Sequence, residues 1–181
     1  MNIKVALRVA LIAVALTSIS SQLQADFITW GMAQTSSSPG DVSNNGTLVN
    51  AFNGGNTTTT VNGVEFAAIN VFGFASNSFL GSGSTGDINF NRLLDQSSFS
   101  FNTGNEKLLD LGSFTNGNTY EIQVWYTDQR AAQNDRVMSF GSTTDGVNRG
   151  SVVDLESDPD NLVNSDFGQF VIGTFVGDGS D

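Results

Sequence analysis

The fold is decided by the stretch Tyr120-Glu121-Ile122-Gln123-Val124-Trp125-Tyr126-Thr127-Asp128-Gln129-Arg130. Alternation at every second residue is typical of a β-strand that is buried on one face. One face carries Tyr120, Ile122, Val124 and Tyr126, and the other carries Glu121, Gln123, Trp125 and Thr127. A tryptophan on the more polar face is either covered by a second layer or left exposed to bind a ligand.

The rest of the chain repeats this pattern in short apolar runs that are separated by Gly, Asn, Ser and Thr. No segment after residue 25 sustains the 3.6-residue apolar period of a helix, and residues 87–95 fit neither period well enough to exceed a short helical turn. We expect strands over residues 27–32, 47–52, 59–64, 69–74, 107–114, 120–127, 136–140, 150–155 and 168–175, with a short piece around Phe99 and Phe101. Within the third of these, the Asn62-Gly63 pair is a hairpin-turn signal that leads the chain into residues 65–67. The sequence therefore predicts an all-β fold, a two-sheet antiparallel β-sandwich of the jelly-roll type.

Residues 1–25 differ in kind from the rest. Lys4 and Arg8 precede an apolar run, and small or polar residues follow it. This is the pattern of a secretory signal-peptide helix, which we expect to be cleaved near Ala25. The alternative is an uncleaved anchor helix, but the apolar run is short for a bilayer core of about 30 Å. We therefore expect one domain over residues 26–181, secreted to the extracellular space or the cell surface, with no stable membrane insertion of the mature chain.

Charge and composition narrow the function classes. Removal of Lys4 and Arg8 with the leader leaves 5 basic residues against 18 acidic ones, a formal charge of −13. Binding to nucleic acid is excluded because it needs a cationic surface. The chain has no histidine and no cysteine, which excludes the usual zinc sites and nucleophile–histidine catalysis.

Three pieces of the chain together resemble a domain of secreted bacterial proteins, many of which carry a C-terminal PEP-CTERM sorting signal. These pieces are Ile28-Thr29-Trp30-Gly31 with residues 41–53 and 61–66, Leu111-Gly112-Ser113-Phe114 leading into residues 120–128, and Gly168-Gln169-Phe170-Val171-Ile172-Gly173-Thr174-Phe175. The resemblance implies a jelly-roll or galactose-binding-like sandwich and export. It also implies a further strand after residue 175 that this chain lacks, so we expect a domain truncated at its C-terminal strand. A missing strand would leave an edge open to association with another strand.

A carbohydrate site is the first candidate for function. Aromatic faces stack on sugar rings, and amide and charged side chains satisfy the hydroxyl groups. The residues at the end of the 120–127 strand that supply this mixture are Trp125, Gln123, Asp128, Arg130 and Asn134. The alternative is that Trp125 packs inside and Arg130 pairs with an acidic neighbour. An indole more than about 90% buried would rule out this site.

A calcium site is the second candidate. The acidic run contributes Asp154, Glu156, Asp158 and Asp160. Calcium takes six to eight oxygen ligands, and carboxylates at alternate positions converge on it where the backbone turns. The alternative is a solvated acidic hairpin loop, and the spacing is not that of an EF-hand.

These observations lead to three hypotheses of function. The first is a secreted, non-catalytic binding or surface module for a polysaccharide or glycan. The second is a structural or assembly protein of the cell envelope or matrix, with no small ligand, in which an edge strand associates. The third is a glycan-active hydrolase, which needs two carboxyl groups about 5–9.5 Å apart; Glu121 is the residue to inspect first.

Overall fold

A computed structural model describes residues 8–13, 27–70, 74–77, 79–80, 83–99, 106–130, 136–143, 149–159 and 167–179. Over these residues the protein is built mainly of antiparallel strands, and the predicted all-β sandwich is confirmed. The strands are β1 (Arg8–Ala13), β2 (Thr29–Trp30), β3 (Gln34–Thr35), β4 (Thr47–Asn53), β5 (Thr59–Val61), β6 (Val64–Ala68), β7 (Phe74–Asn77), β8 (Gln96–Phe99), β9 (Thr119–Tyr126), β10 (Val137–Thr143), β11 (Arg149–Glu156) and β12 (Gln169–Val176). The helices are the one-turn η1 (Pro39–Asp41) and α1 (Ile88–Asp95).

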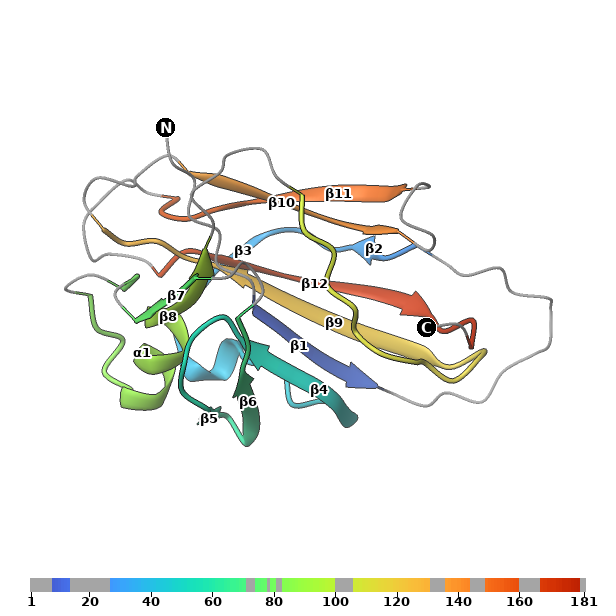
Figure 1. Ribbon diagram of the computed structural model, residues 1–181, viewed down its shortest axis with the longest axis horizontal. Coiled ribbons are helices and arrows are strands. Elements are labelled where there is room, and N and C mark those ends of the chain that lie inside the picture. The colour runs from blue at the N-terminus through green and yellow to red at the C-terminus, as the bar shows by residue number, and fades with distance from the viewer. Residues whose placement is uncertain are drawn as a thin grey trace.

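The main sheet has eight strands, in the order β2-β12-β9-β1-β4-β6-β5, with β3 also paired to β12 (Figure 1). β9 and β12 pair antiparallel along their whole length, from Gln169 opposite Tyr126 to Val176 opposite Thr119. The only parallel pairing among the described strands joins β4 to β6. β10 with β11 and β7 with β8 form two separate two-stranded sheets, and α1 lies in the chain between β7 and β8.

Apolar side chains are buried on both faces of the main sheet. The helix-side core joins α1, the β5–β6 hairpin and one face of β9 and β12, through Phe66, Phe90, Leu93, Leu94, Trp125 and Phe170 among others. The hairpin-side core joins β10 and β11 to the opposite face, through Ile122, Val124, Tyr126, Met138, Phe140, Leu155 and Val171 among others. β9 is therefore a central strand that is covered on both sides.

Local sequence explains the two short elements of the helix side. Asn62 and Gly63 join β5 to β6 with positive φ angles of 48° and 80°, as a two-residue hairpin turn requires. Asp87 caps α1, because its Oδ1 accepts from the backbone N–H of Asn89 at 2.9 Å and of Phe90 at 2.8 Å. The expected helical turn is thus a helix of two turns with a proper N-cap.

The predicted strand over residues 107–114 is wrong. These residues lie outside the sheets, although Leu109, Leu111 and Phe114 pack partly buried on the hairpin-side core. Gly112 has φ +86° and donates its N–H to the Asp110 side chain at 2.8 Å. This local turn competes with the hydrogen bonds of a sheet. The alternating apolar residues therefore pack on the core from an irregular segment and not from a strand. Of the strand expected over 69–74, residues 69–70 are irregular, residues 71–73 lie outside the described part, and Phe74 begins β7.

Residues 8–13 differ from the expected signal-peptide helix. They form β1, which lies between β9 and β4 and is antiparallel to both (Figure 1). The rest of residues 1–25 lies outside the described part of the chain, so the leader and its cleavage stay predictions. In the described residues, neither helix has the length and apolar character that a membrane crossing needs.

Candidate ligand-binding site

Trp125 lies inside the protein and not in a groove. Its side chain is fully buried in the helix-side core. The indole meets the ring of Phe66 edge-on at a centroid distance of 6.0 Å and lies 6.3 Å from Phe170. The expectation of an exposed, ligand-stacking indole is corrected, because a second layer covers this face of β9.

Gln123 is also fully buried and holds a loop in place. Its Nε2 donates to the Asp41 carbonyl at 2.6 Å, and its Oε1 accepts from the Ser43 N–H at 2.9 Å. Both ends of the amide are thus satisfied, as a buried polar group requires. Gln123 fixes residues 41–43 over the sheet and cannot reach a ligand at the surface.

Asp128 and Arg130 form a structural ion pair at the end of β9. The Asp128 carboxylate, which is fully buried, accepts from Nε of Arg130 at 2.6 Å, from Nη2 of Arg130, and from Nη1 of Arg136 at 3.2 Å. The Arg130 guanidinium also lies over the ring of Phe79, 4.3 Å from its centroid. The two arginines occupy the hydrogen-bonding positions of the carboxylate. Asp128 and Arg130 therefore pair with each other, which is the alternative to ligand binding that the sequence left open. Asn134 lies outside the described residues.

The acidic run is divided by its position on β11. Asp154 and Glu156 are exposed on one face of the strand, and Leu155 between them is buried. Asp154 accepts a hydrogen bond from the Ser139 hydroxyl at 2.6 Å. Asp158 is buried beyond the strand end, and Asp160 lies outside the described residues. No three acidic side chains in the described part of the chain gather in a way that would hold a metal ion.

The predicted ligand loop and the acidic run nevertheless meet. The Ser157 carbonyl accepts from the Gln129 side-chain amide at 3.1 Å, and the Gln129 N–H donates to the Phe79 carbonyl at 2.8 Å. The end of β9, the end of β11 and the segment before α1 are therefore joined in one buried polar cluster. The polar groups of this cluster hydrogen-bond to one another, so the cluster holds the three segments together.

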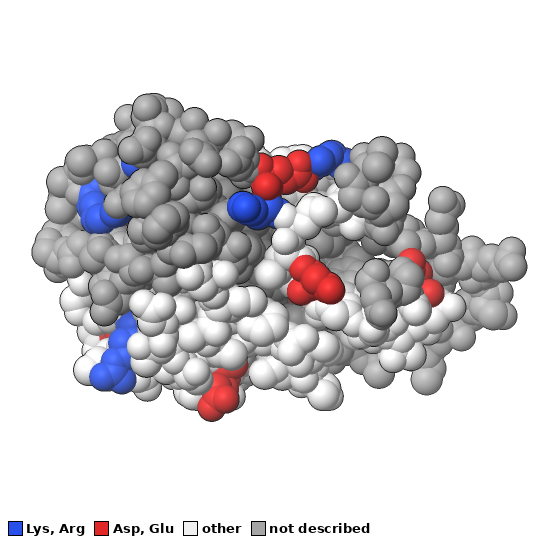
Figure 2. Space-filling view, in the orientation of Figure 1, with Lys and Arg blue, Asp and Glu red and all other residues white. Residues whose placement is uncertain are grey.

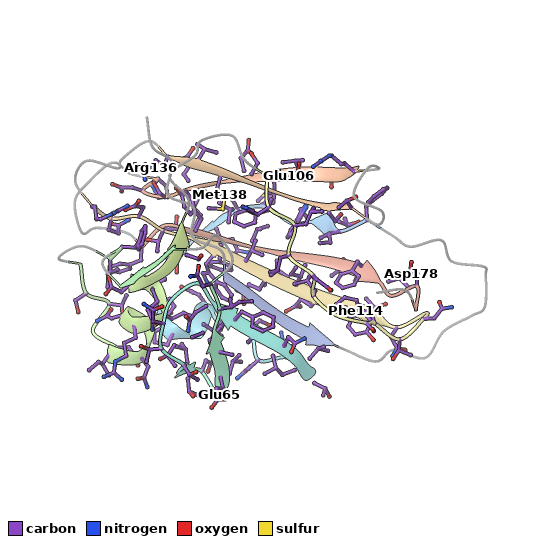
Figure 3. The ribbon with its side chains drawn as sticks, viewed as in Figure 1. Glu65, Glu106, Phe114, Arg136, Met138 and Asp178 are labelled. Carbon is purple, nitrogen blue, oxygen red and sulfur yellow. The ribbon has the colours of Figure 1, made fainter. Side chains whose placement is uncertain are left out.

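The glutamates occupy separate parts of the molecule. Glu65 lies on the β5–β6 hairpin, and Glu106 lies on the opposite side in Figure 3. Glu106 is bound by Arg149, which holds the pKa of its carboxyl below the usual value, chiefly through the hydrogen bond between them. Glu121 accepts from the Ser43 hydroxyl at 2.7 Å. These contacts give each of the two carboxylates a local structural partner.

A pocket of about 300 Å³ lies at the other end of β9. It is lined by Phe27, Thr29, Thr119, Thr174, Phe175 and Val176. The register places Thr29 opposite Thr174 across β2 and β12, and Thr119 opposite Val176 across β9 and β12. Thr29 and Thr174 are exposed. The ends of β2, β9 and β12 thus bring three threonines, with Phe27, Phe175 and Val176, to one opening.

Aromatic packing supports one wall of this pocket. Phe175 meets Phe114 edge-on at 4.9 Å and stacks with Tyr120 at 5.5 Å. The Tyr120 hydroxyl accepts from the Thr115 N–H at 2.8 Å. Figure 3 shows Phe114 at the end of the sheet opposite to Arg136. The pocket and the buried ion-pair cluster are therefore at opposite ends of β9.

The sequence did not reveal this pocket. Its threonines are isolated in the chain and lie in three strands, and no motif links them. Only strand order and register make Thr29 a neighbour of Thr174. The one usable signal was the position of Thr119 and Thr174 at the ends of well-predicted strands.

Surface charge around these elements is sparse. Figure 2 shows acidic and basic side chains scattered over the described part of one face, with uncharged surface between them. Residues 26–181 contain five arginines and lysines, and three of them bind carboxylates. Arg130 and Arg136 bind Asp128, and Arg149 binds Glu106. The remaining charge is strongly negative, which suits an uncharged or cationic ligand.

Comparisons of the chain with protein-family models, with curated proteins and with solved structures find no significant match.

Proposed function

We propose that this protein is an exported, non-catalytic binding module that holds an uncharged carbohydrate at the pocket between the ends of β2, β9 and β12. The observation that carries the proposal is the combination of Thr29, Thr119 and Thr174 with Phe27 and Phe175 in the lining of one opening. Threonine hydroxyls donate to and accept from sugar hydroxyls. Phenyl rings offer an apolar face to the C–H groups of a sugar.

Two further features support a carbohydrate over a charged ligand. The formal charge of −13 for residues 26–181 disfavours phosphate and other anions. The wall behind Phe175 is held by Phe114 and Tyr120, and a preformed site loses little entropy on binding. Catalysis is not part of the proposal, because Glu106 and Glu121 serve structural contacts.

The test is glycan-array binding by residues 26–181, followed by titration calorimetry of the best ligand against Thr174→Val. Valine keeps the shape of threonine and removes the hydroxyl. We expect Kd to rise by about two- to tenfold, since one hydrogen bond is worth about 0.5–1.5 kcal/mol. Thr60→Val is the matched control, because Thr60 is exposed on β5, away from the pocket.

Two results would refute the carbohydrate proposal. One is an array without any binding by a folded protein. The other is a ligand whose Kd responds equally to Thr174→Val and Thr60→Val. Binding that weakens steeply with salt would instead indicate a charged ligand.

Export has its own test. Expression of the full chain in a secreting bacterial host, followed by intact-mass analysis of the medium and periplasm, reports the mature N-terminus. We expect a mass that begins at Asp26 or within a few residues of it. Retention of Met1 in exported protein would contradict cleavage.

Structural calcium at the acidic run is a separate, secondary proposal. Asp154, which accepts from the Ser139 hydroxyl, and Glu156 share an exposed face of β11, so a cation on that side would meet both carboxylates. We expect added calcium to raise the melting temperature and a chelator to lower it, because a ligand of the folded state stabilises it. An unchanged melting temperature in both conditions would end this proposal.

A structural or assembly role is the second candidate function. The strand at the β5 edge of the main sheet is only three residues long and contains two threonines. A short edge strand is a usual protection against pairing with other chains. The feature that favours assembly is instead the position of β1 inside the main sheet, between β9 and β4.

A further inference from the structure

β1 is the strand that joins the two halves of the main sheet. Its six residues pair with β9 without interruption, from Arg8 opposite Trp125 to Ala13 opposite Tyr120. Its other edge pairs with β4, where Val9 lies opposite Phe52 and Ala13 opposite Thr47. One half of the sheet is β2-β12-β9 and the other is β4-β6-β5.

The same six residues lie within the leader that the proposed function removes. This inference rests on that export step and not on carbohydrate binding. Cleavage near Ala25 would leave β9 and β4 facing an empty strand position. In an antiparallel sheet, each residue of a strand directs its N–H and its C=O at the same neighbouring strand, and successive residues alternate between the two neighbours. The side chains of β9 from Ile122 to Tyr126 are buried, so their backbone groups would lose partners where water has little access.

Direct closure of β4 onto β9 is opposed by contacts already in place. Gln123 binds both Asp41 and Ser43, and Glu121 accepts from the Ser43 hydroxyl. This segment leads into β4, which would have to move by one strand spacing of about 4.8 Å. Asn50 on β4 also donates to the Leu111 carbonyl at 3.3 Å. The new pair would be parallel as well, because β4 and β9 are both antiparallel to β1.

We propose that the processed chain takes up a β-strand from another polypeptide in the position between β9 and β4. The occupant is an extended apolar segment of about six residues that begins with a basic residue and runs antiparallel to β9. The segment seated there in the unprocessed chain, Arg8-Val9-Ala10-Leu11-Ile12-Ala13, has this chemistry. The basic residue suits a body of formal charge −13. Strand addition of this kind gains affinity from main-chain hydrogen bonds.

The experiment starts from the folded full chain, with a recognition sequence for a site-specific protease placed within residues 14–25. After cleavage, the N-terminal fragment is removed and backbone amide exchange is followed by mass spectrometry. We expect those amides of residues 47–52 and 120–125 that face β1 to exchange at least tenfold faster in the stripped body, while the amides of β9 that face β12 stay protected. A peptide of residues 4–15 should restore their protection, and the same peptide with Ala10→Pro should not, because proline removes a ladder donor.

A third peptide tests the charge of the occupant. Replacing Lys4 and Arg8 with Glu should raise Kd at low salt by at least tenfold and by less at high salt. The inference is overturned if the stripped body keeps full protection in β9 and β4, which would mean that the sheet closes by itself. It is also overturned if both wild-type and Ala10→Pro peptides act alike, or if the stripped body unfolds and no peptide restores it. None of these measurements uses a glycan, so they fail or succeed independently of the carbohydrate site.

Discussion

The carboxylate of Asp128 is held by two nitrogens of the Arg130 guanidinium, two residues further along the chain. Asp128 is fully buried, while the Arg130 side chain keeps 22% of its exposure and lies over the Phe79 ring. Arg136 binds the same carboxylate from β10's leading end. The ion pair therefore fixes the polar end of β9 to the start of β10, at the place where the sequence predicted a ligand site.

Asp128→Asn should therefore destabilise the protein without any ligand present. The substitution removes the charge that compensates Arg130 and Arg136, and breaking a buried ion pair costs about 3–5 kcal/mol. Urea denaturation measures the loss in the free energy of unfolding. Asp154→Asn is the matched control on exposed β11, where we expect less than about 0.5 kcal/mol. Equal effects of the two substitutions would contradict the structural role of Asp128.

Stability should fall at alkaline pH through Tyr126. Burial, followed by the negative charge of Asp128, raises the pKa of the Tyr126 phenol well above its ordinary value. Since the folded-state pKa is raised, the unfolded state loses its proton first. The contribution is complete below about pH 10, the ordinary pKa, and is lost as pH rises above it.

The measurement is the melting temperature of wild type and Tyr126→Phe between pH 8 and pH 11. Phenylalanine cannot ionise, so the variant should lose less stability than wild type over the upper part of this range. A constant difference between the two proteins across the range would show that Tyr126 does not contribute to this pH dependence.

Gly168→Ala should be much more damaging than Gly63→Ala. Both glycines have positive φ, +78° and +80°, and a side chain there costs about 1–2 kcal/mol. A Cβ on Gly63 meets nothing within 4 Å, whereas one on Gly168 would overlap the Tyr126 carbonyl and approach the Thr127 Cα to 2.8 Å. Chemical denaturation should show a loss above about 4 kcal/mol only for Gly168→Ala. Similar losses would mean that β12 can shift away from β9.

Trp125 should behave as a buried fluorophore that does not sense a ligand. The chain has two tryptophans, so Trp30→Phe leaves Trp125 alone. We expect its emission to be blue-shifted, poorly quenched by acrylamide and unchanged by glycan. In the reciprocal variant Trp125→Phe, the half-buried Trp30, whose Nε1 donates to the Ser151 carbonyl at 3.2 Å, should be quenched more strongly. Strong quenching of Trp125 would contradict its place in the helix-side core.

Local signals in the sequence were sufficient for most strands. The alternation in residues 120–127 matches β9 to within one residue, and the Asn62-Gly63 pair marks the β5–β6 hairpin. These succeeded because a strand pattern and a positive-φ turn depend on neighbouring residues. The segment 107–114 failed because its alternating apolar residues pack on the core while the Asp110–Gly112 turn prevents a ladder.

The sequence by itself determined the all-β class, the alternation of β9 and the acidic balance, because these follow from residue types and their spacing along the chain. Only the tertiary structure decided that Trp125 and Gln123 are covered, that Asp128 is neutralised by two arginines, and that Thr29 and Thr174 share a pocket. Which face of a strand is covered depends on the layer that packs against it. Which threonines become neighbours depends on strand order and register, and both are set by pairings between residues far apart in the chain.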